Sequence, residues 1–576
     1  MFELSKISKL GILLFLYLSN LLFTIKFTSL KVGVNDDEFF EQLVSGFFTG
    51  YPEAFTHIAP ASPQWFFGFL ISRLYLINND VSWYYLFLAF SVVISLICIN
   101  FLVWINNFIK PIFKLSISLL NFYALFWYVS SPTYTSASFF IAFAGIYIFV
   151  HKIVNNLKGY KFEFISSLFL ILSISIRSES FLAGLILLLP ILISILLFNR
   201  KNFKQNIKSL SVIITPVLFI VFINYASDQY YFSKSNWKIY QEFNTARYKI
   251  QDNELERFIS DNLNKTNWSQ VKFKLFDSYN FVDFNSYTGS ELNSLIKQVN
   301  FEESKISINF NDLLKRWKAY TLYFYMIFAA SIILILYSKL NLLTQNHKFQ
   351  KILIDFIWFL LFIGTWIVFI LYISIFLRLP ERVVFPIISS LIYGIVLFEF
   401  RNKIYVQNNN EKIFLKIFQY VSILLIFLCV QIDFNKMYEL RKNPAYVSFW
   451  SEQKNSLLQI NNGKILIGNA SQVKSIWSNP YIINEEIRRL NFLPLGWYSF
   501  SPYWNKRAEI MGLKTKSILT ELNEKSNLYW LSDDEYTQYL IEFNFELNGI
   551  KLIPKKVLNK TFDFGDYSVY EFNNKT

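Results

Sequence analysis

Residues 162–198 decide the fold, because they read FEFISSLFLILSISIRSESFLAGLILLLPILISILLF. Apolar side chains dominate this stretch, and Arg177-Ser178-Glu179 is its one clear polar break. A helix needs about 20 mostly apolar residues to cross a hydrocarbon layer about 30 Å thick. We therefore expect two spanning helices, 162–176 and 180–198, joined by a tight turn at the break.

Apolar blocks of similar length recur on both sides of this stretch. They lie at 10–27, 83–105, 115–130, 133–151, 209–226, 318–337, 352–377, 383–400 and 413–431. Together the blocks predict a polytopic α-helical membrane protein with about eleven transmembrane helices. The first block follows Lys6 and Lys9 and is followed by no small-residue cleavage pattern, so we expect a retained signal-anchor.

The composition of the 576 residues agrees with this fold class. Charged residues make up 17% of the chain and hydrophobic residues 53%, whereas an average soluble protein has roughly 25% charged residues. The formal net charge is +14, but Lys and Arg lie mainly in short loops between apolar blocks, so no nucleic-acid partner is expected. The two cysteines lie in separate apolar blocks and the three histidines are scattered, so neither a disulfide framework nor a zinc site is predicted.

The positions of the basic residues predict the orientation of the chain. If the N-terminus is cytoplasmic, every predicted cytoplasmic loop contains basic residues, namely Lys110 and Lys114; Lys152, Lys158 and Lys161; Arg200, Lys201, Lys204 and Lys208; Lys339, Lys348 and Lys351; and Arg401, Lys403 and Lys412. This alternation follows the excess of Lys and Arg in cytoplasmic loops of membrane proteins.

Three polar stretches are then expected on the outer face. The first loop, 29–82, contains a weaker apolar run at 65–77 that Arg73 interrupts, and we interpret this run as a helix on the membrane surface. The second is a large loop at 227–316, and the third is the tail at 432–576. In the tail, β-type runs at 464–468, 527–531 and 567–571 alternate with helical stretches at 516–525 and 533–545. We therefore predict a transmembrane domain at 1–431 and a small extracytoplasmic α/β domain with a mixed sheet at 432–576.

The first outer loop begins with an acidic cluster, Asn35-Asp36-Asp37-Glu38-Phe39-Phe40-Glu41. If this segment is helical, Asp37 and Glu41 share one face, because side chains four residues apart are neighbours on a helix. A carboxylate at a boundary between water and lipid is a candidate general base. The structural alternative is a helix cap followed by a solvated acidic turn.

Two further turns on the predicted outer face carry arginines. They are Arg177-Ser178-Glu179 and Arg378-Leu-Pro-Glu-Arg382. The planar guanidinium group matches the oxygens of a phosphate, which favours an anionic lipid head group as the ligand. The structural alternatives are an ion pair between Arg177 and Glu179 and arginines that extend toward the membrane surface. Acids and arginines on one face together predict a lipid-dependent transferase.

The stretch from Asn35 to Tyr84 resembles the GT-C superfamily of membrane glycosyltransferases, which includes protein O-mannosyltransferases and lipid A aminoarabinose transferases. Asp37-Glu38-Phe39-Phe40 is similar to the Asp-Glu motif in the first loop of the mannosyltransferases. Gly50-Tyr51-Pro52 and His57-Ile-Ala-Pro60 fall near that family's glycine and His-Pro-Pro positions, although Ile-Ala separates His57 from Pro60 here. The stretch also resembles GT-C-like proteins of bacterial surface-polysaccharide clusters. The tail resembles no family.

This resemblance implies a sugar donor carried on a polyprenyl phosphate in a bacterial cytoplasmic membrane. Asp37 or Asp36 would take a proton from the acceptor hydroxyl during inverting transfer, and Arg177, Arg378 and Arg382 would stabilise the departing phosphate. The supporting candidates are Glu38, Glu41, His57 and Glu179. No metal cofactor is implied, although Asp36 and Asp37 leave room for a divalent ion. The acceptor stays open between a lipid, a glycan and a protein.

Two other functions stay open at this point. A polysaccharide polymerase or ligase that uses a lipid-diphosphate donor would explain the large loop at 227–316. A flippase or transporter would need ionisable residues near the membrane midplane or two matching halves, and the sequence has neither. In the tail, Trp497, Tyr498, Tyr503 and Trp504 are expected to pack at the membrane interface or to stack on acceptor sugars.

Overall fold

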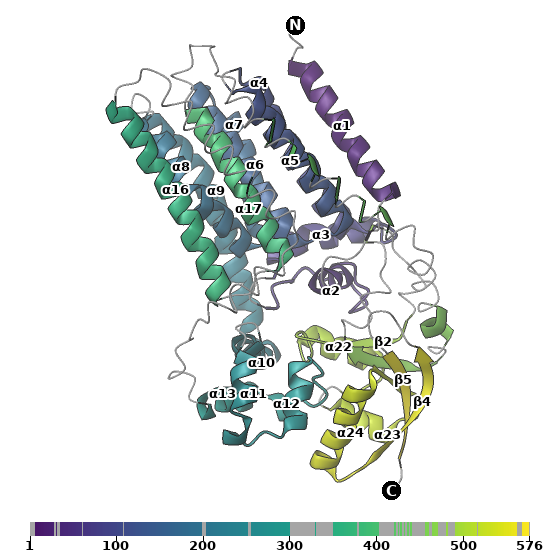
Figure 1. Ribbon diagram of the computed structural model, residues 1–576. Coiled ribbons are helices and arrows are strands. Elements are labelled where there is room, and N and C mark those ends of the chain that lie inside the picture. Colours follow the sequence, from purple (N-terminus) through teal and green to yellow (C-terminus); the bar gives the residue numbers. More distant parts are fainter. Residues whose placement is uncertain are drawn as a thin grey trace. The chain divides into compact units, whose positions relative to one another are not determined.

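The protein is described by a computed structural model, drawn in Figure 1. The residues that it describes are 6–27, 30, 35–59, 62–107, 109–198, 203–251, 255–299, 329, 349–376, 380–401, scattered positions between 420 and 439, 455–459, 463–469, 480–481, 490–514, 517–560 and 567–574. The helices predicted at 318–337 and 413–431 lie largely outside these residues, and so does Arg378.

The chain divides into two compact units. We call the first the membrane unit, and it comprises Met1–Leu30, Tyr84–Asn224 and Ile308–Pro444. We call the second the loop unit, and it comprises Lys31–Trp83, Tyr225–Ser307 and Ala445–Thr576. The loop unit thus groups the tail with the stretches that the sequence predicts as outer loops, while the domain boundary at residue 431 stays a prediction.

Long apolar helices build the membrane unit. They are α1 (Lys6–Phe27), α4 (Trp83–Ile105), α5 (Pro111–Ser130), α6 (Tyr134–Asn155), α7 (Lys161–Ile176), α8 (Ser178–Phe198), α9 (Phe203–Phe232), α16 (Phe349–Phe376) and α17 (Glu381–Arg401). Among the described residues, seven helices are long and apolar enough to cross a membrane. The fold class predicted from the sequence is therefore confirmed: the protein is a multi-pass, α-helical membrane protein.

Helix α6 lies at the centre of the membrane unit. It packs against α7, α8 and α17, because small residues along it let the neighbouring helices approach closely. A Cβ atom on Gly145 would lie 2.7 Å from Leu170 Cδ2 of α7. In the same contact, Ser166 Oγ donates to the Gly145 carbonyl at 2.8 Å. Close helix contacts of this kind hold the middle of α6 against α7.

The cytoplasmic-loop assignment of Lys152 was wrong. Helix α6 continues to Asn155, so Lys152 lies in its last turn and is only 5% exposed. Its ammonium group pairs with the buried carboxylate of Glu163 in α7 and donates to Ser209 Oγ at 2.7 Å. A charge with such partners can lie inside a protein, whereas an unpaired one would not.

The loop unit contains short helices from all three of its segments. The first segment provides α2 (Asn35–Val44) and α3 (Trp65–Ile77), and α3 coincides with the predicted surface run. The second segment provides α10 (Ser235–Gln251), α11 (Leu255–Asp261), η2 (Leu263–Lys265), α12 (Gln270–Asp277), η3 (Asn285–Tyr287) and α13 (Gly289–Gln298). The tail provides α22 (Pro502–Ile510), α23 (Ile518–Glu524) and α24 (Asp534–Asn548).

A five-stranded sheet organises the tail. The strands are β1 (Ile465–Asn469), β2 (Phe492–Leu495), β3 (Leu528–Ser532), β4 (Leu552–Lys560) and β5 (Tyr567–Asn574), in the order β2-β1-β3-β5-β4. Strand β1 pairs parallel with β2 and β3, whereas β5 pairs antiparallel with β3 and β4. Helix α24 packs against β3 and β4. The mixed sheet predicted for the tail is confirmed, whereas the prediction that the tail forms a domain of its own stays a prediction.

Direct contacts join the three segments of the loop unit. Ile518 of the tail donates its backbone N–H to the Val282 carbonyl of the second segment at 2.8 Å. Phe55 of the first segment stacks on Tyr231 with ring centroids 4.0 Å apart. These contacts connect parts of the chain that the spanning helices separate in sequence.

The aromatic run of the tail packs inside this unit. The Tyr498 ring stacks on Phe39 of α2 at 4.0 Å, and the Tyr503 ring meets the edge of Trp237 at 5.1 Å. Trp504 is fully buried, and its Nε1 donates to the carbonyl oxygen of the preceding strand β2 at 2.8 Å. For Tyr498, Tyr503 and Trp504, both predicted roles were therefore wrong, because these side chains form the interior of the unit.

Candidate functional site

The turn between α7 and α8 holds Arg177 in a defined position. Arg177 caps α7 in an extended conformation, and its N–H donates to the Ser173 carbonyl at 3.0 Å. Its guanidinium Nη1 donates to Thr135 Oγ1 of α6. The guanidinium carbon also lies 5.3 Å from the centroid of the Tyr134 ring, a cation–π contact. Arg177 is therefore fixed beside the first turn of α6.

Arg382, in the first turn of α17, contacts the same end of α6 through its backbone carbonyl. Ser136 Oγ donates to the Arg382 carbonyl at 2.9 Å, and Ser138 Oγ donates to the Arg177 carbonyl at 3.0 Å. Thr133 caps α6 by accepting the Ser136 N–H. Because the N-terminal end of a helix carries partial positive charge, two arginine turns placed there form a surface suited to an anion.

The alternative pairing of Arg177 with Glu179 is present but weak. The Nε of Arg177 lies 3.9 Å from Glu179 Oε2, and the Glu179 side chain is 50% exposed. An exposed pair at that distance contributes little to stability. The hydrogen bond to Thr135 therefore defines the position of Arg177 more than the ion pair does.

An apolar groove runs between α8 and α16 in the same unit. Its volume is about 580 Å³, and it is lined by Ile186, Ile357, Leu360, Leu361, Gly364, Thr365, Val368, Phe369 and Tyr372. Helix α8 begins directly after Arg177, so Ile186 lies nine residues further along, roughly 14 Å at the rise of an α-helix. A hydrocarbon chain is the kind of ligand that this lining favours.

Helix α2 carries the predicted acids in its first turn. Acids are favourable there because they lie at the positive end of the helix dipole. Asp37 is fully buried, whereas Asp36 is partly exposed and its Oδ1 accepts from Trp497 Nε1 at 2.8 Å. The alternative interpretation as a solvated acidic turn was wrong for Asp37, Glu38 and Glu41, because all three are buried.

Neighbouring polar groups hold the other acids of α2. Glu41 Oε1 accepts from the Tyr75 hydroxyl of α3 at 3.1 Å, and Glu38 Oε1 accepts from Gln42 Nε2 at 3.1 Å. Burial, followed by the charges of Glu38 and Asp36, raises the pKa of Tyr498 well above its usual value. Tyr498 therefore stays protonated beside the acids at neutral pH.

His57 forms a pair that the sequence analysis missed. Its Nδ1 lies 2.7 Å from Oδ2 of Asp228, near the C-terminal end of α9. The side chains are 21% and 16% exposed, respectively. A carboxylate at Nδ1 favours the tautomer that carries the proton there, which leaves Nε2 as a proton acceptor. No local signal identified Asp228, since it is 171 residues from its partner.

The described part of the chain contains no group of three or more His, Cys, Asp or Glu side chains that could hold a metal ion. Within the membrane unit, the backbone carbonyls of Arg177 and Arg382 accept from two serines near the N-terminal end of α6. The acids of α2 and the His57–Asp228 pair belong to the loop unit. That these two sets meet around one donor stays a prediction. The sequence also gave no reason to single out Thr135 or Tyr75.

No protein-family model matches the chain, and no curated protein matches it in sequence. The structure of ArnT from Cupriavidus metallidurans bound to undecaprenyl phosphate is similar over 97% of both chains, with 10% identity and a TM-score of 0.44. The apo state of that protein gives the same coverage and identity with a TM-score of 0.38. Aminoarabinose transferases are among the GT-C enzymes that the first loop resembles. A likeness of this size does not establish a reaction, which has to be inferred from the residues of this chain.

Proposed function

We propose that the protein is an inverting membrane glycosyltransferase that moves a sugar from a polyprenyl-phosphate donor to an acceptor hydroxyl. The observation that carries the proposal is the meeting of the Arg177 and Arg382 turns at the N-terminus of α6. Guanidinium groups, hydroxyls and a helix N-terminus are the partners that a phosphate takes in proteins. Undecaprenyl phosphate is a donor carrier of this chemical class.

The groove between α8 and α16 supports a lipid-linked donor rather than a soluble one. Its lining is almost entirely apolar, and it begins within a few helical turns of Arg177. A polyprenyl chain in this groove would place its phosphate near the α6 terminus. Thr365 and Tyr372 are the residues of the described lining with polar side-chain groups, which is too few for the phosphates and ribose of a soluble nucleotide sugar.

The proposed base is Asp37. It is fully buried in the first turn of α2, whereas Asp36 is partly exposed and accepts from Trp497. In the proposed step, the Asp37 carboxylate takes the proton of the acceptor hydroxyl as that oxygen bonds to the anomeric carbon. The bond between the anomeric carbon and the phosphate oxygen breaks, and the electron pair leaves on the phosphate. Arg177 and Arg382, and Arg378 by its position in sequence, stabilise the added negative charge.

The packing of the loop unit supports a placement on the outer face with a cytoplasmic N-terminus. Helices α4 to α9 separate its first segment from its second. If all six helices cross the membrane, as the apolar blocks predict, the chain returns to the side from which it started, which agrees with a unit built from both segments. The alternation of basic residues supports the exterior as that side, and the resemblance to GT-C enzymes implies a bacterial cytoplasmic membrane.

The test is transfer from radiolabelled polyprenyl-phosphate sugars by the purified protein in lipid nanodiscs. A positioned general base contributes about 10²- to 10⁴-fold to a rate, so Asp37→Asn should slow transfer by at least about a hundredfold. Asp36→Asn should have a smaller effect, and Asp261→Asn, an exposed position in α11, should have none. Unchanged transfer by Asp37→Asn would exclude this carboxylate as the base.

The same assay distinguishes the proposed transferase from a polysaccharide polymerase or ligase, which is the main alternative. A polymerase or ligase would use a lipid-diphosphate donor, which the large second segment of the loop unit keeps in consideration. Transfer from the diphosphate carrier but not from the monophosphate carrier would support that function instead.

A further inference from the structure

A polar cavity lies in the second segment of the loop unit, between the end of α11 and the start of α12. Its volume is about 420 Å³, within the range of about 300–1,000 Å³ that is typical of ligand pockets. Asn264, Thr266, Gln270 and Lys274 provide polar groups, and Trp268 and Phe273 provide apolar surface. None of these residues takes part in the donor site proposed above.

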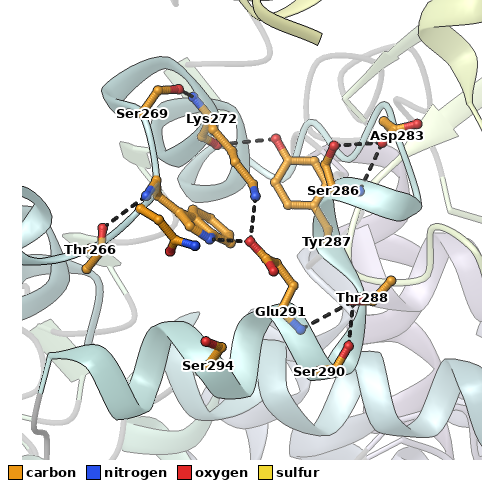
Figure 2. Close-up of polar contacts among 12 residues, drawn as sticks. Thr266, Ser269, Lys272, Asp283, Ser286, Tyr287, Thr288, Ser290, Glu291 and Ser294 are labelled. Carbon is orange, nitrogen blue, oxygen red and sulfur yellow. Dashed lines mark hydrogen bonds and ion pairs between the residues drawn. The ribbon is translucent and has the colours of Figure 1, made fainter.

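Trp268 is held rigidly in the wall of this cavity. Its indole N–H donates to Glu291 Oε1 at 3.0 Å, and its backbone N–H donates to Thr266 Oγ1 at 3.2 Å. Lys272 Nζ pairs with the same Glu291 oxygen at 2.9 Å and lies 4.3 Å from the centroid of the indole ring (Figure 2). The wall is therefore formed before any ligand binds, which lowers the entropy cost of binding.

The elements behind the wall are fixed as well. Thr288 caps α13 by accepting the N–H of Glu291 at 3.2 Å, and the Tyr287 hydroxyl donates to the Lys272 carbonyl at 3.2 Å (Figure 2). Ser269 caps α12, accepting the N–H of Lys272 at 3.1 Å. Of the cavity's polar groups, the Thr266 hydroxyl is already engaged, because it accepts the Trp268 N–H and donates to the Leu263 carbonyl at 2.8 Å. Asn264, Gln270 and Lys274 are therefore the groups offered to a ligand.

We propose that this cavity binds a saccharide unit of the acceptor, so that the acceptor is a glycan. A sugar presents hydroxyls along its edges and apolar C–H groups on its faces. The cavity matches the hydroxyls, because Asn264, Gln270 and Lys274 offer amide and ammonium groups. Only the small exposed parts of the buried Trp268 and Phe273 rings meet the face of a sugar. Lys274 adds a positive charge, which favours a sugar that carries a carboxylate. This inference rests on the proposed transferase function, whose acceptor it specifies.

The experiment measures binding without any donor. Isothermal titration calorimetry of the full-length protein in detergent would use two probes, the neutral disaccharide chitobiose and the acidic disaccharide digalacturonate. Asn264 is exposed in the ligand-free protein, so Asn264→Ala should weaken binding of the preferred disaccharide by about three- to tenfold, the effect expected from the loss of one hydrogen bond. Lys274→Ala should weaken the binding of digalacturonate by at least as much, and it should change the affinity for chitobiose little.

Matched controls are Asn293→Ala and Lys297→Ala, two exposed positions of α13 that do not line the cavity. Both should bind like the wild type. Absence of saturable binding for both disaccharides, or binding that the two cavity variants fully retain, would overturn the proposal. Because no lipid donor is present, such a result leaves the transferase function standing, and saccharide binding without any transfer would overturn only the transferase.

Discussion

Replacing Thr135 by valine tests how the structure positions Arg177. The substitution keeps the shape and volume of the side chain and removes only its hydroxyl. In the wild type that hydroxyl accepts a hydrogen bond from the guanidinium Nη1 of Arg177. Among the described residues, the ion pair of Arg177 is a long contact of 3.9 Å to Glu179. Without Thr135, the guanidinium group loses the partner that fixes it at the start of α6.

The size of the effect follows from the contacts. A hydrogen bond to a charged group contributes roughly 1.5–3 kcal/mol, but Arg177 retains its stacking on Tyr134 in the variant. We therefore expect a loss of about 1–1.5 kcal/mol in donor binding, which raises the donor KM about five- to tenfold. Arg177→Gln removes the charge itself and should raise the donor KM further and lower kcat, since the guanidinium stabilises the leaving phosphate.

The assay is the initial rate of transfer against donor concentration, with thermal unfolding as a check on folding. Thr215→Val is the matched control, because Thr215 is a threonine of α9 that bonds only within its own helix, to the Ser211 carbonyl. The Thr135 variant should change KM and leave kcat nearly unchanged. Equal kinetics for the Thr135 and Thr215 variants would refute the positioning role.

Three more predictions concern packing and the other polar pairs. Gly289→Ala should destabilise the loop unit by roughly 1–3 kcal/mol in thermal unfolding, because the new Cβ would lie 2.7 Å from the backbone of α10. Glu163→Gln leaves Lys152 buried without its counter-charge, so we expect a loss of roughly 3–5 kcal/mol that a second substitution, Lys152→Met, largely restores. If His57 and Asp228 act as one unit, the double variant His57→Gln/Asp228→Asn should transfer sugar no more slowly than the slower single variant. A rate loss in the double variant equal to the product of the two single losses would instead mean that the two side chains act independently.

Much of the fold could be predicted because the membrane imposes a simple rule on the sequence. The break at Arg177 placed the end of α7 and the start of α8 almost to the residue, since a helix in hydrocarbon ends where charged groups begin. Three strands of the tail, β1, β3 and β5, could be predicted from short β-branched and aromatic runs, whereas β2 and β4 were missed. The burial of Lys152 could not, because it depends on Glu163 of the next helix.

In the candidate site, too, some residues could be predicted from the sequence and others were found only in the structure. The acids of α2 and the arginine turns were identified from residue type and from their position after a spanning helix. Their partners were not, because Thr135 and Tyr75 carry no mark in the sequence that distinguishes them from other hydroxyl residues, and Trp497 was singled out for its aromatic ring rather than as a donor to Asp36. Each becomes significant only through one hydrogen bond to a charged group.

The sequence by itself therefore determined which segments lie in lipid and which lie in water. Transfer energies of the individual residues decide this, and they depend only on local hydrophobicity and on the positions of basic residues. Only the tertiary structure decided which distant segments share an interior. It joined three separate polar stretches into one loop unit and brought two arginine turns to one helix terminus. Such contacts depend on the complementary shapes of surfaces far apart in the chain, and no local pattern of residues records them.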